Sequence, residues 1–145
     1  MESKSIKEIL QWTVNASFAC RKPSELIAVW HESHRKVYEA TGDIRVWAED
    51  LRIFKILCNL NTDVVNLASH PGSTHPRYDP LNGRRVSRLE QARTSLDNAI
   101  AGQLERWITM LSALQDSDVT LPEGYGRDLE KIVYSLETLE QTLGE

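Results

Sequence analysis

The stretch that decides the fold is residues 43–69, DIRVWAEDLRIFKILCNLNTDVVNLAS, which contains neither glycine nor proline. Its apolar residues recur every three or four positions, which is the spacing of a helical face. They form two adjacent stripes. The first stripe consists of Val46, Ile53, Leu57, Leu60, Val64 and Leu67, and the second of Trp47, Leu51, Phe54, Cys58, Val65 and Ala68. We assign the opposite side of the helix to the polar residues Arg45, Glu49, Arg52, Lys55, Asn59, Asp63 and Asn66. Two stripes exceed the roughly 100° of an ordinary surface helix, so we expect neighbouring helices on at least two sides.

Further helices are expected around this central one. The same periodicity predicts them over residues 5–18, 24–41, about 84–115 and about 127–143. Gly42 suits the left-handed residue that closes many helices, and Asp43 can cap the next one. Three prolines and two glycines in residues 70–83 predict an irregular loop. The predicted fold is all-α: one domain over residues 1–145, a mostly antiparallel bundle of about five helices around the long central helix (43–69).

The composition is that of a globular protein, with 41% apolar residues, 26% charged residues and a net charge of −4. No apolar run reaches the 18 residues or so that a membrane helix needs. The N-terminus carries both signs of charge instead of an apolar leader, so we expect a cytoplasmic protein. Cys20 and Cys58 lie in apolar patterns and are expected to be reduced thiols. The acidic balance argues against general nucleic-acid binding.

Asp50 stands out within the central helix because it falls in the first apolar stripe, where an unpaired carboxylate would be costly to bury. Arg93 occupies a similar place in the next long helix, between Leu89 and Leu96. We therefore predict a buried ion pair between Asp50 and Arg93. A structural pair that fixes helix register is favoured over an active-site acid.

A second candidate site lies in the loop and helix start at residues 70–88. Positive charge and hydrogen-bond donors gather there in an otherwise acidic chain, at His70, His75, Arg77, Tyr78, Arg84, Arg85 and Arg88. Arginines beside the free N–H groups of a helix start can bind an anion. There is no glycine-rich phosphate loop, and a solvated basic turn is the competing interpretation.

Motifs for catalysis or metal binding are not found. His31-Glu32-Ser33-His34 resembles the zinc-protease pattern, but its histidines are three residues apart, whereas that motif needs four. No Glu stands three residues before a His, as helical di-iron proteins require. We therefore expect no metal and no cofactor, with metal chemistry at His31, His34, His70 and His75 the least favoured reading.

These observations favour a non-enzymatic helical module that binds another protein or associates with itself. The alternative is a bundle that binds a small anionic ligand at residues 70–88 and is possibly an enzyme. The sequence leaves the identity of any partner or ligand open.

Overall fold

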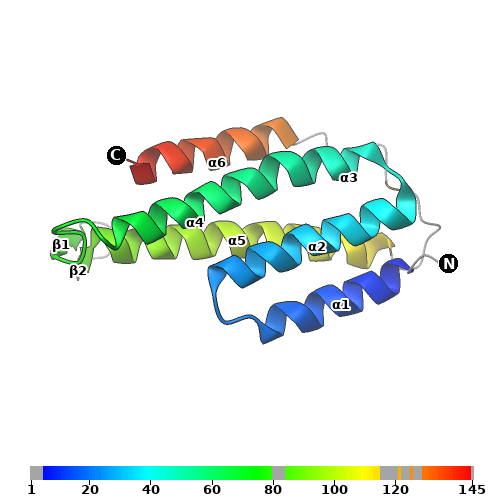
Figure 1. The fold of residues 1–145 in the computed structure, drawn as a ribbon, viewed down its shortest axis with the longest axis horizontal. Coiled ribbons are helices and arrows are strands. Elements are labelled where there is room, and N and C mark those ends of the chain that lie inside the picture. Colours follow the sequence, from blue (N-terminus) through cyan, green and yellow to red (C-terminus); the bar gives the residue numbers. More distant parts are fainter. Residues whose placement is uncertain (1–4, 80–83, 115–120, 122–124, 126–128, 145) are drawn as a thin grey trace.

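The computed structural model describes residues 5–79, 84–114, 121, 125 and 129–144, most of which are helical (Figure 1). In chain order the elements are α1 (Ile6–Ala19), α2 (Pro23–Thr41), α3 (Ile44–Glu49), the π-helical turn η1 (Asp50–Phe54), α4 (Lys55–Leu67), β1 (Pro76–Asp79), β2 (Arg84–Ser87), α5 (Arg88–Leu114) and α6 (Leu129–Gly144). Because α3, η1 and α4 follow one another without a break, they form one rod, the predicted central helix. The predicted all-α bundle is confirmed.

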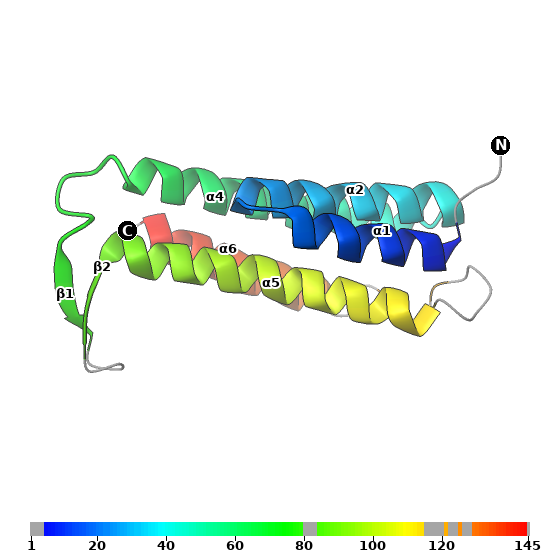
Figure 2. The ribbon, with the colours of Figure 1, turned by 90° about the horizontal axis from the view of Figure 1, so that it is seen from below.

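The long central rod holds the bundle together. α2 packs on α3, η1 and α4, while α5 and α6 pack on α4, and α1 closes the bundle against α2 and α5. Figures 1 and 2 show the helices running roughly along one common axis. The α1–α2 hairpin is short: α2 has 19 residues and α5 has 27. One end of α4 and α5 therefore extends beyond the α1–α2 turn, as both views show.

Local chemistry explains several helix ends. The Ser5 side chain accepts a hydrogen bond from the Glu8 amide at the start of α1, and Asp43 does the same for Arg45 at the start of α3. Pro23 is the first residue of α2, where its missing N–H costs nothing. Gly42 closes α2 with a φ of 68°, as predicted.

The hydrophobic core is built on one of the two stripes of the central rod. Its first stripe is buried against α2 and α5, and two tryptophans, Trp30 and Trp107, are buried with it. The second stripe is not a core stripe, because Trp47 is 41% exposed, Leu51 52% and Val65 61%. The prediction that neighbouring helices contact the rod on at least two sides is confirmed, by α2, α5 and α6. These neighbours leave the face of the second stripe partly open.

Pro76–Asp79 and Arg84–Ser87 also differ from the predicted irregular loop and helix start, because they form two antiparallel strands. β1 pairs with β2, with Arg77 opposite Val86 and Asp79 opposite Arg84. Pro76 is tolerated because it is the first residue of its strand. α5 consequently begins at Arg88, after the second strand. No helix in the described part of the chain is long and apolar enough to cross a membrane.

Candidate functional site

Asp50 is buried, but the structure places a different partner beside it. Its Oδ1 lies 2.7 Å from Nδ1 of His31, across the contact between η1 and α2. The His31 ring also stacks on Phe54, with 4.1 Å between the ring centroids. The predicted Asp50–Arg93 ion pair does not appear among the described residues. α2 covers Asp50 directly, whereas Arg93 lies on the extended end of α5, beside the α1–α2 turn.

Glu49 is a buried carboxylate that the sequence analysis missed, since we assigned it to the polar side of the central helix. It is only 1% exposed. One oxygen faces Nε2 of His34 at 3.2 Å and accepts a hydrogen bond from Arg106, and the other accepts the hydroxyl hydrogen of Tyr125. Glu49 therefore joins the central rod to α2, to α5 and to the segment that precedes α6.

The electrostatics of this cluster keep Glu49 ionised. Burial by itself raises the pKa of Glu49, but the hydrogen bonds and charges of His34, Arg106 and Tyr125 outweigh it, so the pKa lies below its usual value. Burial and the adjacent Glu49 carboxylate raise the pKa of Tyr125. The hydroxyl of Tyr125 thus stays protonated and able to donate to Glu49.

A second buried polar chain connects three helices. Nε1 of Trp107 donates to Oγ of Ser33 at 2.7 Å. The Ser33 hydroxyl lies 2.6 Å from Oγ1 of Thr13, which in turn donates to the carbonyl of Ile9 at 2.7 Å. Because the hydroxyls of Ser33 and Thr13 both have hydrogen-bond partners, we interpret this series of hydrogen bonds as structural. It fixes α5 on α2 and α2 on α1.

The remaining histidines and the predicted anion site do not form a described cluster. His70 and His75 are exposed on the turn after α4, and the Arg88 side chain reaches the carbonyl of Leu143 at 3.4 Å. The side chains of Arg77, Tyr78, Arg84 and Arg85 lie outside the described residues, so the anion site at residues 70–88 stays a prediction. Within the described ranges, no three His, Cys, Asp or Glu residues gather as a metal site requires.

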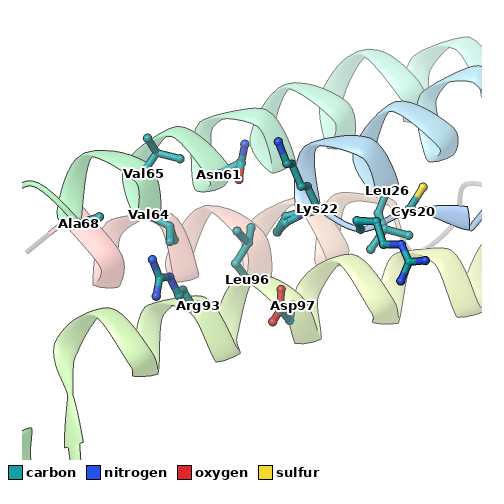
Figure 3. A pocket seen from close by; sticks show the side chains of 12 residues that line it. Cys20, Lys22, Leu26, Asn61, Val64, Val65, Ala68, Arg93, Leu96 and Asp97 are labelled. Carbon is teal, nitrogen blue, oxygen red and sulfur yellow. The ribbon is translucent and has the colours of Figure 1, made fainter. Parts of the chain in front are cut away.

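The feature with the geometry of a binding site is a groove at the α1–α2 turn (Figure 3). It has a volume of about 650 Å³, within the range of ordinary ligand and peptide pockets. We call it the turn groove and define it by the residues that line it: Cys20, Arg21, Lys22, Pro23, Leu26, Asn61, Val64, Val65, Ala68, Arg93, Leu96 and Asp97. It exists because the α1–α2 hairpin ends before α4 and α5 do.

Apolar side chains from three helices form much of the turn groove. Figure 3 shows Val64 on α4 directed toward α5, where Leu96 lies, with Val65 and Ala68 elsewhere on α4 and Leu26 of α2 at the end nearer the turn. Val65 and Ala68 are exposed, so the groove presents apolar surface to its surroundings. The Cys20 thiol also lines the groove, but burial and the charge of Glu25 raise its pKa, which makes it a poor nucleophile. The described lining of the groove is therefore largely apolar, and its one thiol is not activated.

The charges around the groove are mostly positive. Arg21 and Lys22 come from the α1–α2 turn and Arg93 from α5, against the lining carboxylate of Asp97 and the nearby carboxylate of Glu25, which accepts a hydrogen bond from the Arg21 backbone N–H. None of the three cationic side chains forms an ion pair with any residue that the structure describes. In a protein with a net charge of −4, this is a local positive patch with its charges available to a partner.

A second depression continues from the turn groove along α5. It has a volume of about 560 Å³ and shares Leu26 and Asp97 with the groove. Its other lining residues fall on one face of α5: Ala101, Leu104, Glu105, Ile108 and Thr109. Together the two depressions follow α5 from Arg93 to Thr109, or about 24 Å at the rise of an α-helix.

Comparison with known proteins does not place the chain in a family. No family model, curated protein or solved structure matches it. A functional interpretation therefore rests on the turn groove, the charges that line it and the track that continues from it along α5.

Proposed function

We propose that this protein is a non-enzymatic interaction module whose turn groove receives an amphipathic, acidic helix of a partner protein. The observation that carries the proposal is the groove itself, where apolar residues of α4 and α5 are left uncovered beside three cations without described ion pairs. Binding an apolar helical face in such a groove is a common mode of peptide recognition.

The shape of the site favours a helix over other occupants. The α1–α2 hairpin covers α4 and α5 along part of their length and stops at the turn. A helix from another protein could lie over the turn groove and along the flank of the hairpin, and pack on the apolar residues that the hairpin leaves open. The track of about 24 Å along α5 matches about 16 residues, or four turns, of such a helix.

The charges favour an acidic partner. A neutral or basic helix would leave Arg21, Lys22 and Arg93 without a counter-charge at the edge of the contact, whereas acidic side chains would pair with them. Such pairs mainly set specificity and association rate, while burial of apolar surface supplies most of the affinity.

The proposal can be tested by selecting peptides against the purified protein. A display library of helical peptides of about 16 residues would fix an apolar face at positions i, i+3, i+4 and i+7 and randomise the other positions. We expect enriched peptides to be acidic, and to gain helical circular dichroism on binding.

Matched variants then locate the binding site. Val65→Glu places a carboxylate in the turn groove, and Ile44→Glu makes the same change at an equally exposed residue of α3, outside the groove. We expect the selected peptides to lose at least about tenfold in affinity on Val65→Glu and to be unaffected by Ile44→Glu. Equal affinity for the two variants would reject the turn groove as the site. Failure to enrich any helical peptide would reject the proposed function.

Self-association is the alternative occupant of the groove. Light scattering of the purified protein over a concentration series measures it directly. A dimer that Val65→Glu dissociates and Ile44→Glu does not would assign the groove to a second copy of the chain instead of a partner protein.

A further inference from the structure

The turn groove also suggests which of its residues selects the partner. We infer that Arg93 is a specificity-determining residue, which pairs with an acidic side chain of the bound helix. This inference rests on the proposed function and specifies the recognition chemistry of the same site.

Arg93 is placed to do this by its position on α5. It belongs to the end of α5 that extends beyond the α1–α2 turn, and it is exposed. Figure 3 shows its side chain directed from α5 toward Val64 of α4, across the groove. A helix seated in the groove between α4 and α5 would therefore pass beside the guanidinium group of Arg93.

The surroundings of Arg93 leave this charge for a partner. No ion pair of Arg93 is present in the described part of the chain, although Asp97 follows one helical turn later on the same face of α5. Figure 3 shows Lys22 on the far side of the groove, with its amino end directed toward Asn61 of α4 and away from Arg93. The guanidinium group of Arg93 is consequently a cation at the α5 side of the groove that has no ion pair among the described residues.

A guanidinium group is also the suitable chemistry for selection. Its planar fork can form two parallel hydrogen bonds with one carboxylate, which a lysine cannot do. Seating a helix on the apolar residues beside Arg93 would exclude water from part of this contact and strengthen the pairing. The partner helix should therefore carry a Glu or Asp at the position that faces Arg93.

The test exchanges charges between the protein and a selected peptide. The probe is a groove-dependent peptide from the selection, together with versions in which each of its acidic residues in turn is replaced by lysine. We expect Arg93→Glu to weaken binding of the original peptide about five- to tenfold. One lysine version of the peptide should bind the wild-type protein more weakly by a similar factor, and should regain most of that affinity on the Arg93→Glu protein.

Two controls separate local pairing from general electrostatics. Lys131→Glu changes the net charge by the same amount as Arg93→Glu, but lies on the exposed side of α6, away from the groove. We expect it to change affinity by less than twofold at about 150 mM salt, where charges more than about 8 Å apart are largely screened. Arg93→Lys keeps the charge and loses the fork, and should recover only part of the affinity.

The outcomes distinguish this inference from the proposed function. Suppose a selected peptide binds in the groove, but none of its lysine versions binds better to Arg93→Glu than to the wild-type protein. This result would overturn the role of Arg93 and leave the docking function standing. Equal losses for Arg93→Glu and Lys131→Glu would also overturn it, because net charge alone would then explain the effect. If no groove-dependent peptide is selected, both are rejected.

Discussion

Replacing Glu49 with glutamine tests whether the buried cluster stabilises the fold. Gln has nearly the same shape as Glu, so Glu49→Gln removes the charge without opening a cavity. The carboxylate accepts hydrogen bonds from Arg106 and Tyr125, and Nε2 of His34 lies 3.2 Å from one of its oxygens. An amide oxygen can satisfy some of these donors, and the new NH₂ group would face the others.

The size of the effect follows from the burial of the partners. Removing one member of a buried charged network usually costs about 3–5 kcal/mol. Arg106 is 37% exposed and can regain water when its partner is lost, which moves the expected value toward the lower end. His34 and Tyr125 are buried and cannot regain water. We therefore expect a loss of about 3 kcal/mol in the free energy of unfolding.

Urea unfolding followed by tryptophan fluorescence measures this loss, because Trp30 and Trp107 lie against His34. The matched control is Glu130→Gln, which removes an exposed carboxylate paired with Arg52 and should leave stability unchanged within error. A loss below about 1 kcal/mol for Glu49→Gln, or equal losses for both variants, would refute the stabilising role of the cluster.

Four further predictions concern stability. Leu57→Ala should cost about 2–5 kcal/mol in urea unfolding, since Leu57 is fully buried in the central rod; a loss under about 1 kcal/mol would place that rod outside the core. Ser33→Ala should cost about 1–3 kcal/mol, because it leaves the buried indole N–H of Trp107 without its acceptor, and Trp107→Phe made on this background should cost less than on the wild type. The depressed pKa of Glu49 stabilises the fold above the usual glutamate value of 4.5, so stability should fall as the pH drops through the lower folded pKa, and fall less in Glu49→Gln. The raised pKa of Tyr125 gives the opposite pH dependence: its contribution to stability is complete below pH 10 and is lost as the pH rises further. Thermal unfolding over a pH series should show this loss in the wild type and not in Tyr125→Phe.

Helix positions could be predicted from the sequence because they depend on local chemistry. The spacing of apolar residues and the cap residues Gly42 and Asp43 are local signals, and the helix boundaries agree with the structure to within a few residues. Glu49 shows the limit of this reasoning. It lies three residues after Val46 and four before Ile53, so its spacing places it beside the buried stripe. Only the charge of its side chain led us to assign Glu49 to the polar side of the helix.

The contacts that determine the site depend on residues far apart in the chain. Asp50 could have paired with any cation on a neighbouring helix, and periodicity does not say that His31 lies opposite it. The turn groove depends on the difference in length between the α1–α2 hairpin and the α4–α5 pair. The predicted lengths contained that signal, together with the cations Arg21 and Lys22 at the turn. What sequence analysis lacked was the arrangement of the helices.

The π-helical turn at Asp50–Phe54 has a consequence for how this chain tolerates insertions and deletions. A π turn holds one residue more than an α turn, so the rod already contains the equivalent of a single-residue insertion. Deleting one residue there would restore a regular α-helix, but it would rotate α3 by about 100° relative to α4. Glu49 would then leave its contacts with α2 and α5, while the α4 contacts with α6 stayed in place. The extra residue thus sets two segments of one helix to different rotational phases, each matched to its own neighbours.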